Sequence, residues 1–373
     1  MRALVLGTLL LLFLAAAQAQ TRPQLAAKAW LLADLTSGQL LAAENADERF
    51  APASLTKLMT AYVVFRALRG KTMAASDVVQ VSERAWRAGG SRMFLEPGKP
   101  VSVQELVHGL VAASGNDAAL ALAEVCAGSE AAFVALMNRE AARLGMAHTS
   151  FLNATGFSAP GHASTARDLY VLAAALIREF PQEYARYYAQ KEFSYNDITQ
   201  MNRNRLLWLD PSVDGVKTGY TEDAGYCLIA SSQRGGRRLL SVLLGAGTDS
   251  ARAQESQKLL NWGYQNFDGV QLYAPGEAVK SIEVWKGAQA MVPAGFARGL
   301  VVTVPKGAAA RLQAELMTLP PVLAPVSKGQ KVGMLRIALG DAPLGEYPVV
   351  ALERVGESGF LGRAWDTLRL WVK

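Results

Sequence analysis

The sequence has few of the residues that build metal centres and disulfide frameworks. Its 373 residues include only two cysteines, Cys126 and Cys227, and three histidines, His108, His148 and His162. Neither cysteine stands in a C-x-x-C or metal-ligand spacing, and the histidines are far apart with no i, i+4 pair. This pattern argues against a zinc site and favours two buried free thiols over a disulfide. The histidine count still permits a Ser-His-Asp triad, but no pattern points to one.

Long apolar runs are absent except at the start of the chain. There, an arginine at position 2 is followed by a nearly unbroken apolar run and then by A-Q-A, a small-residue cleavage site. These features predict a secretory signal peptide over residues 1–19 and an exported mature chain from about Gln20. An uncleaved membrane anchor fits less well, because the run is short for a helix that spans a bilayer.

Charge of one sign is only slightly in excess. The chain has 38 Lys and Arg against 32 Asp and Glu, a formal net charge of +6. The predicted leader contains one arginine and no acid, so its removal lowers the net charge from +6 to +5. In an exported protein this balance fits an anionic partner such as a cell envelope or membrane surface. Because the excess is modest and spread out, we do not expect nucleic acid as a partner.

The stretch Ala51–Thr60, A-P-A-S-L-T-K-L-M-T, combines a helix start with a candidate nucleophile, Ser54, and a candidate base, Lys57. Pro52 precedes an apolar-periodic run, which predicts a helix beginning near Ser54. Residues three apart on a helix share a face, so the Lys57 amine can lie against the Ser54 hydroxyl. In isolation such a pair is more typical of a helix cap and a surface lysine, so its meaning depends on companion motifs.

Hydrophobic periodicity predicts two antiparallel hairpins and several helices in the first part of the chain. The expected strands are Lys28–Asp34, Gln39–Glu44, Gly225–Ser231 and Leu239–Leu244. The expected helices, besides the one near Ser54, are Val101–Val111, Ala118–Cys126, Glu130–Leu144, Arg167–Phe180 and Arg252–Gln265.

From about Gly276 the pattern changes to short alternating or apolar runs separated by Gly and Pro turns, which predicts a small, mainly β domain without a catalytic constellation. Its expected strands are Val279–Val284, Leu300–Val304, Ala310–Met317, Val332–Ala338 and Tyr347–Glu353. The chain is thereby divided into a leader (1–19), a first domain (24–270), a β domain (276–355) and a terminal helix (358–373).

The tail, Phe360–Lys373, has the pattern of an amphipathic helix. Its apolar residues fall on one face, and three basic residues lie away from that face. The apolar face consists of Leu361, Ala364, Trp365, Leu368, Trp371 and Val372. Such a face can lie in a membrane interface or pack against the β domain, and the two Trp residues favour the interface.

Two companion motifs accompany the Ser54–Lys57 pair. Ser114-Gly115-Asn116 falls in a turn between two predicted helices, and Lys217-Thr218-Gly219 precedes a predicted strand. Motifs of the kinds S-x-x-K, S-x-N and K-T-G occur together in serine acyl-transfer enzymes that react with β-lactams. A second S-x-N stands at Ser194-Tyr195-Asn196, but we prefer Ser114 because it lies between helices, well before the strand.

With these motifs the chain resembles the low-molecular-mass penicillin-binding proteins, the D-alanyl-D-alanine carboxypeptidases of bacterial peptidoglycan. The likeness covers nearly the whole chain, including P-A-S-L-T-K-L-M-T, S-G-N-D-A, A-T-G with S-T-A-R-D, and K-L-L-N-W-G. It implies an α+β fold, with a penicillin-binding/β-lactamase-like domain whose antiparallel sheet is flanked by helices, then a small all-β domain and a C-terminal amphipathic helix. It also implies a peripheral location at the periplasmic face of the inner membrane.

The residue chemistry assigns roles around the nucleophile. Ser54 is a poor nucleophile at neutral pH and needs a base within hydrogen-bond reach. Lys57 can serve when neutral, and burial beside a second cation, Lys217, would lower its pKa. Ser114 can relay a proton between the lysines and the leaving amine, and Asn116 can orient Lys57 and bind the substrate amide.

The remaining roles concern substrate binding. By resemblance, the backbone N–H groups of the nucleophile and of Tyr220 form the oxyanion hole; some relatives carry His at this position, which bears on fine substrate preference. Lys217 and Thr218 offer donors to the terminal carboxylate, and Arg252 matches an arginine that the family places near it. Gly219 lets the substrate approach the strand closely and add as an extra strand.

The sequence therefore predicts a serine-type D-Ala-D-Ala carboxypeptidase that removes the terminal D-alanine from peptidoglycan pentapeptide stems through an acyl-enzyme. It would need no metal or organic cofactor, and β-lactams would be covalent inhibitors. A DD-endopeptidase or a β-lactamase on the same fold stays open, although no separate Glu motif supplies the deacylation base of class A lactamases. A non-catalytic peptidoglycan-binding protein is disfavoured, since a pure binder needs no nucleophile.

Overall fold

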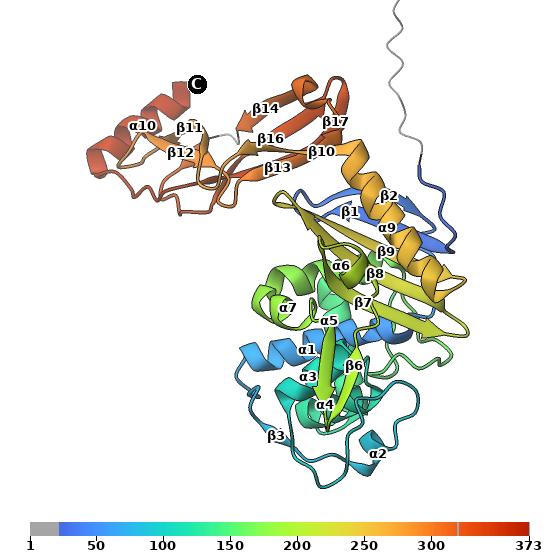
Figure 1. Ribbon diagram of the computed structural model, residues 1–373. Coiled ribbons are helices and arrows are strands. Elements are labelled where there is room, and N and C mark those ends of the chain that lie inside the picture. The colour runs from blue at the N-terminus through green and yellow to red at the C-terminus, as the bar shows by residue number, and fades with distance from the viewer. Residues whose placement is uncertain (1–21, 319–320, 373) are drawn as a thin grey trace, which may run out of the picture.

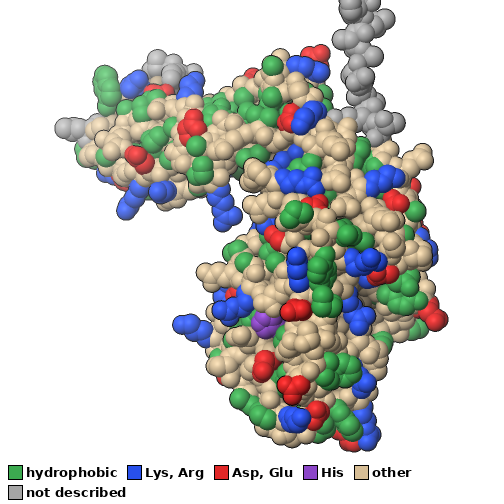
Figure 2. All heavy atoms as spheres, in the orientation of Figure 1, with side chains coloured by type: hydrophobic (Ala, Val, Ile, Leu, Met, Phe, Trp, Pro, Cys, Tyr) green, Lys and Arg blue, Asp and Glu red, His purple; other side chains and the backbone are tan. Residues whose placement is uncertain are grey.

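The computed structural model describes residues 22–318 and 321–372. It contains two domains of different make-up, as Figure 1 shows: helices cover both faces of a sheet in the first, and strands dominate the second. The predicted α+β architecture with a trailing β domain is confirmed. Lys and Arg side chains are scattered over both domains on the face seen in Figure 2, in keeping with the spread of charge along the sequence.

The sheet of the first domain has five antiparallel strands in the order β2-β1-β9-β8-β7. Both predicted hairpins are present, and β1 joins them by pairing with β9. The K-T-G motif lies on β7, an edge strand with one free side. The strands are β1 Ala29–Asp34, β2 Gln39–Glu44, β7 Val213–Thr221, β8 Gly225–Arg234 and β9 Arg237–Ala246.

Helices on both faces explain why β1 reads as a continuous apolar run. Trp30 and Leu32 belong to the core beneath α9 (Asp249–Asn266), while Leu31 belongs to the larger core on the other face. That larger core also contains α1 (Lys57–Arg69) and α6 (Ala166–Glu179). The other helices of the domain are α2 Glu83–Trp86, α3 Val103–Val111, α4 Asn116–Ala127, α5 Glu130–Leu144, α7 Pro181–Tyr187 and α8 Leu206–Leu209.

Some predicted boundaries differ from those observed. The helix expected near Ser54 begins as a 3₁₀ turn, η1 (Ala53–Thr56), before α1 starts at Lys57. The helix expected from Val101 starts two residues later, because Ser102 and Glu105 form a capping box. Four short strands were not predicted; they form two small antiparallel pairs, β3 Val78–Val79 with β4 Val101–Ser102, and β5 Glu192–Tyr195 with β6 Ile198–Met201.

The second domain is built around a six-stranded sheet in the order β14-β16-β17-β12-β11-β15, with β10 and β13 as a separate pair. The five predicted strands are present. β10, β12 and β15 were not predicted; in β12, Pro293 and Gly295 resemble turn residues. The elements are β10 Phe267–Tyr273, β11 Ala278–Trp285, β12 Met291–Gly295, β13 Leu300–Pro305, the 3₁₀ turn η2 Ala309–Arg311, β14 Leu312–Thr318, β15 Val322–Leu323, β16 Lys331–Leu339 and β17 Ala342–Ala351.

The tail forms α10 (Phe360–Val372), at the end of the β domain farthest from the first domain (Figure 1). Asp366 accepts a hydrogen bond from the Lys286 backbone N–H (2.6 Å), and the Arg369 guanidinium lies 5.2 Å from the centre of the Trp285 ring. Phe360 and Trp365 are 78% and 65% exposed. The helix therefore contacts the β domain on one side and presents aromatic side chains to solvent on another.

The two domains meet through polar contacts between the β1–β2 hairpin and β13. The buried carboxylate of Asp34 accepts hydrogen bonds from Thr303 Oγ1 (2.8 Å) and Arg237 Nε (2.5 Å). The Gln39 side-chain amide exchanges two hydrogen bonds with the Thr303 backbone, at 2.6 and 3.0 Å. These contacts hold β13 against the sheet of the first domain.

The two segments that bear on export and membrane attachment lie only partly within the described residues. The predicted signal peptide lies outside the described residues, as do several side chains of α10. Within residues 22–318 and 321–372, no single helix has the length and apolar character needed to cross a membrane. α4 and α5 reach that standard only when taken together, as a pair bent by 86°.

Candidate active site

The η1 turn brings Ser54 and Lys57 together. In a 3₁₀ turn, side chains three residues apart are eclipsed, and the Lys57 Nζ atom lies 2.9 Å from Ser54 Oγ. Lys57 is 1% exposed, whereas Ser54 lines an open cleft. The local fold thus combines a sheltered amine with an accessible hydroxyl.

Two carbonyl oxygens fix the orientation of the Lys57 amine. Nζ donates to Asn116 Oδ1 and to the backbone oxygen of Thr155, both at 2.7 Å. The Asn116 amide nitrogen donates to Gly89 O (2.8 Å), which is consistent with its oxygen facing Lys57. A neutral amine has two hydrogens and one lone pair, so these two acceptors use the hydrogens and leave the lone pair for the Ser54 hydroxyl. That is the arrangement a general base requires.

The electrostatic surroundings favour the neutral amine. Burial lowers the pKa of Lys57 to about 7; the Arg203 guanidinium lowers it too, and Asp117 opposes the shift. The repulsion expected between Lys57 and Lys217 is present, since Lys57 is among the cations that lower the pKa of Lys217. Arg203 is a further cation, not expected from the sequence, that acts on both lysines.

The S-G-N turn and β7 supply the other side of the site. Lys217 Nζ donates to Ser114 Oγ (2.9 Å) and to Thr218 O (3.0 Å). Burial holds the pKa of Lys217 well below its usual value, and neighbouring cations add to the effect. Ser114 has φ = +58°, a left-handed conformation that is uncommon for a residue with a side chain. Ser194, by contrast, lies on β5, with its hydroxyl 2.7 Å from Thr199 Oγ1.

Arg252 approaches β7 from α9. Its side chain is largely buried, donates through Nη1 to Gly219 O (3.2 Å) and forms an ion pair with Asp249. Tyr220 is 50% exposed, and its ring centre lies 4.3 Å from that of Tyr226. Arg252 therefore places a cation beside the last residues of K-T-G-Y, and we call this part of the cleft its cationic end.

These residues surround one cleft of about 290 Å³. Its lining is Ser54, Ser91, Ser114, Arg203, Thr218, Gly219, Tyr220, Tyr226, Asp249 and Arg252. Lys57, Asn116 and Lys217 are buried around it and reach it through their hydrogen bonds. The structure thus brings all nine predicted site residues to one place.

Sequence reasoning missed Arg203, Ser91 and Tyr226. Arg203 lies in N-R-N-R, which matches no motif considered above. The adjacent Asn204 is 1% exposed and donates to Gly215 O (3.0 Å), which attaches this loop to β7. The sequence offers only asparagines beside arginines at this point, and without the fold they cannot be connected to K-T-G.

The described residues contain no group of three His, Cys, Asp or Glu side chains that could hold a metal ion. Neither cysteine is in a disulfide: Cys227 is buried on β8 and Cys126 is half-buried. Burial raises the pKa of the Cys227 thiol to about 11. Both thiols are free as expected, although Cys126 is less buried than predicted.

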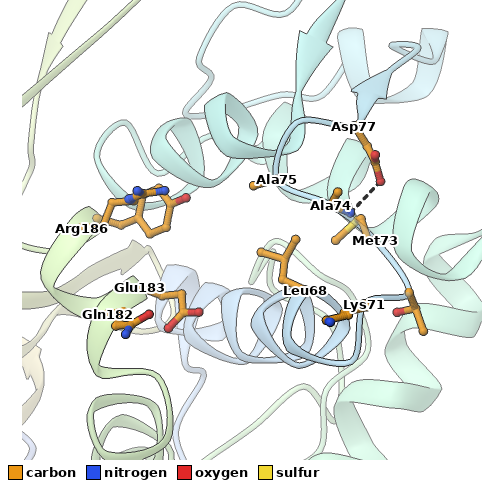
Figure 3. A pocket seen from close by; sticks show the side chains of 11 residues that line it. Leu68, Lys71, Met73, Ala74, Ala75, Asp77, Gln182, Glu183 and Arg186 are labelled. Atoms are coloured by element: carbon orange, nitrogen blue, oxygen red, sulfur yellow. Dashed lines mark hydrogen bonds between the residues drawn. The ribbon is translucent and has the colours of Figure 1, made fainter.

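A larger cavity of about 910 Å³ lies at the far end of α1 (Figure 3). In Figure 3, Leu68 points into it from α1, between α7 and the loop that carries Lys71 and Asp77. α1 has 13 residues, so this cavity is about 18 Å along the helix from Lys57. No predicted site residue lines it, so the chemical groups gather at the smaller cleft.

Comparisons with known proteins agree over most of the chain. A family model described as D-alanyl-D-alanine carboxypeptidase matches residues 16–248, and one described as penicillin-binding protein 5, C-terminal domain, matches residues 267–357. The chain is 45% identical to D-alanyl-D-alanine carboxypeptidase DacC of Escherichia coli, covering 94% of this chain and 90% of that protein. It is 40% identical to DacA of the same organism, with 93% and 88% covered.

Solved structures give the same picture. Penicillin-binding protein 5 from Haemophilus influenzae has a TM-score of 0.84 and 38% identity, with 90% of this chain and 99% of that chain covered. Penicillin-binding protein 6B from Escherichia coli has a TM-score of 0.74 and 38% identity, with 90% and 98% covered. Penicillin-binding protein D2 from Listeria monocytogenes, solved in an ampicillin-bound form, has a TM-score of 0.60 and 32% identity, with 66% and 100% covered.

Proposed function

This chain belongs to the D-alanyl-D-alanine carboxypeptidase family, and from that premise we propose how its residues perform the reaction. The protein is a serine-type D-Ala-D-Ala carboxypeptidase that removes the terminal D-alanine from peptidoglycan stem peptides through an acyl-enzyme. The observation that carries the proposal is the position of the Lys57 amine, which lies 2.9 Å from Ser54 Oγ and is held by two carbonyl acceptors.

In acylation, Ser54 Oγ attacks the carbonyl carbon of the penultimate D-alanine while Lys57 takes the hydroxyl proton. The backbone N–H groups of Ser54 and Tyr220 stabilise the oxyanion. The peptide C–N bond then breaks, and the proton held by Lys57 reaches the leaving amine through Ser114, which also accepts a hydrogen bond from Lys217. Water then attacks the ester, neutral Lys57 takes a proton from it and returns a proton to Ser54 Oγ, and the shortened peptide is released.

Substrate recognition is assigned to the cationic end of the cleft. Arg252, Thr218 and Lys217 receive the terminal carboxylate, while Asn116 holds Lys57 and offers its second amide hydrogen to the substrate. The peptide adds as a strand beside the free edge of β7 at Gly219. This assignment is supported by the presence of both Arg203 and Arg252 in the cleft lining.

A test of the carboxylate assignment compares two substrates. Arg252→Ala should lower kcat/KM for a peptide ending in D-Ala-D-Ala by about 10²-fold, since a charge-assisted hydrogen bond is lost. The same peptide ending in an amide should lose much less. Equal losses for the two substrates would remove Arg252 from the carboxylate site.

The reaction itself is tested by its products. We expect D-alanine release from a pentapeptide, slow hydrolysis of penicillin, and little cleavage of cross-linked peptide dimers. Penicillin-binding protein D2 from Listeria monocytogenes was solved with ampicillin bound, which supports β-lactams as ligands of this cleft. Dimer cleavage without D-alanine release would indicate an endopeptidase, and rapid penicillin turnover would indicate a lactamase.

The cellular location is also proposed. A chain exported through residues 1–19 would act at the periplasmic face of the inner membrane, with α10 as a peripheral contact. The exposed Phe360 and Trp365 support this contact, because aromatic rings favour the membrane interface. Phe360→Ser with Trp365→Ser should weaken binding to anionic vesicles and leave activity on soluble peptide unchanged. Unchanged vesicle binding would contradict the membrane role.

The domain limits follow from the same assignment. We propose the division expected from the sequence, with a leader (1–19), a carboxypeptidase domain (24–270), a β domain (276–355) and a terminal helix (358–373), and change only the boundary between the two domains. The end of α9 at Asn266 supports a boundary close to residue 270. Because β10 pairs with β13, the second domain is better started a few residues earlier, at Phe267.

A further inference from the structure

His162 is a buried histidine that the mechanism above does not use. It is 4% exposed, in the loop between α5 and α6. Its Nε2 lies 2.9 Å from Thr56 Oγ1, and its Nδ1 accepts a hydrogen bond from the Leu152 backbone N–H at 3.1 Å. The Phe151 ring packs against the imidazole edge to face, with centres 5.9 Å apart.

These two partners define the tautomer. A backbone N–H can only donate, so Nδ1 must carry a lone pair. In the neutral imidazole the hydrogen is then on Nε2, which donates it to the Thr56 hydroxyl. If Nδ1 were protonated, its N–H would face the Leu152 backbone N–H, and this hydrogen bond would be lost because neither group can accept.

The two contacts join segments that meet at the nucleophile. Thr56 is the last residue of η1, directly before Lys57. Leu152 begins the segment 152–156, whose Thr155 oxygen accepts from Lys57 Nζ. Gly156 in the same segment lies so close to Ala53 that an added Cβ would be 1.9 Å from the Ala53 carbonyl oxygen.

Among the described residues, two side chains of α1 hydrogen-bond to segment 152–156. One is Lys57, and the other is Thr60, whose Oγ1 donates to Ala154 O at 2.7 Å. His162 therefore provides the connection closest to the start of the S-x-x-K turn. It anchors the segment on the side of Leu152, while Thr60 anchors it at Ala154. Thr155 lies directly after these two anchors, where a small shift changes its distance to Lys57.

We propose that His162 is a positioning residue: as the Nε2–H tautomer it ties segment 152–156 to the S-x-x-K turn and thereby holds the Thr155 oxygen on Lys57. The inference rests on the proposed function and deepens it. With Thr155 O in place, both amine hydrogens are used and the lone pair faces Ser54. Without it, the amine can rotate and the lone pair is no longer directed.

The surroundings keep the imidazole neutral. Burial lowers the pKa of His162 to about 4. Two titratable groups hydrogen-bond to segment 152–156 itself: Lys57 on α1, and Glu130 at the start of α5, whose Oε1 accepts from the Ala154 backbone N–H. Neither forms an ion pair with the imidazole, so the tautomer should persist throughout the range in which Lys57 titrates.

The tautomer is tested directly by ¹⁵N NMR of the wild-type protein. His162 should show a protonated Nε2 and an unprotonated Nδ1 from pH 5 to 8, with no titration in that range. A protonated Nδ1, or a titration near pH 6.5, would overturn the proposal, because either result is incompatible with the bond from Leu152.

The effect on catalysis is tested by three variants. His162→Leu removes both hydrogen bonds, and the acylation rate constant with penicillin should fall about 10²-fold. His162→Gln keeps one donor and one acceptor and should recover most of that loss. His148→Leu, at an exposed histidine of the same loop, is the matched control and should acylate at the wild-type rate.

A purely structural role would give a different pattern. We expect the loss in the rate constant of acylation and less than about a threefold change in the dissociation constant of the pre-covalent complex. Equal losses in the Leu and Gln variants, or wild-type rates in His162→Leu, would overturn the proposal. If His162→Leu does not fold, Thr56→Val removes the same hydrogen bond and should lower the rate about tenfold; a wild-type rate in Thr56→Val would then be the contradicting result. Failure of the wild-type protein to acylate at all would instead overturn the proposed function.

Discussion

The two domains bury different kinds of side chain. The first buries charged groups at or beside the cleft, namely Lys57, Asp117, Lys217 and Arg252, and others farther away, such as Asp34 at the domain contact. In the described part of the β domain, residues 267–318 and 321–355, Thr303 is the only fully buried polar side chain, and it contacts the first domain. Because burying charge is costly, the first domain carries a cost that the β domain avoids, and part of that cost lies at the cleft, where the chemistry takes place.

The same contrast holds for how the domains are stabilised. The β domain has a continuous apolar core, with Val302, Ile337 and Val349 fully buried. The catalytic cleft instead depends on hydrogen bonds that hold reactive groups in place, such as those of Lys57 to Asn116 and Thr155. We therefore expect substitutions at the cleft to lower activity and substitutions in the β-domain core to lower stability.

The largest effect should come from Lys57→Ala. Loss of the general base should lower the acylation rate with penicillin by about 10²–10⁴-fold. The matched control is Lys331→Ala at the exposed start of β16, where the rate should not change. Stopped-flow or quenched-flow acylation measures both. A Lys57→Ala variant that acylates at the wild-type rate would contradict the role of Lys57 as general base, and with it the functional difference between the domains.

The pH profile should reflect the same buried amine. Lys57 acts as a base only when neutral, and burial lowers its pKa to about 7. The acylation rate should therefore rise with pH and level off above about 7, and it should fall about tenfold per pH unit well below that value. A profile that rises only near pH 10 would show that the amine keeps an ordinary pKa.

Ile337→Ala should have the opposite outcome to Lys57→Ala. Ile337 is fully buried in the β-domain core, so truncation should lower the free energy of unfolding of that domain by about 2–5 kcal/mol. Acylation of Ser54 by penicillin should be unchanged. Thermal unfolding and acylation rates measured on one preparation test both statements, and a matching loss of acylation would show that the domains are not separate in function.

The smallest effect should come from Thr303→Val at the domain contact. The variant keeps the shape of the side chain but removes the hydroxyl bonded to Asp34. Since Arg237 still pairs with Asp34, the loss should be about 1 kcal/mol in the free energy of unfolding. Chemical denaturation measures it. A loss several times larger would mean that this hydroxyl, rather than the apolar cores, determines the stability of the assembly.

Much of this organisation could be predicted from the sequence. The helix Glu130–Leu144 was predicted with the observed limits, because its apolar periodicity is bounded by Ser129 and Gly145 as caps. Ser54, Ser114 and Lys217 could be named since each belongs to a motif with a chemical reason for its spacing. The alternation of apolar and polar residues likewise predicted five strands of the β domain.

What could not be predicted depends on long-range contacts. The Thr155 oxygen reaches Lys57 from 98 residues away, and His162 reaches Thr56 from 106 residues away. A backbone carbonyl has no sequence signature, and a single histidine has too many roles for its position to be informative. The effect of Arg203 on Lys57 was missed for the same reason, because only the fold places its loop beside β7.

The most direct test of the account is intact-mass analysis of the wild-type protein and Ser54→Ala with penicillin, together with D-alanine release from a D-Ala-D-Ala peptide. The account predicts a mass increase of one penicillin and D-alanine release for the wild type, and neither for Ser54→Ala. A mass increase that persists in Ser54→Ala, or a wild-type protein with neither adduct nor release, would contradict the serine mechanism.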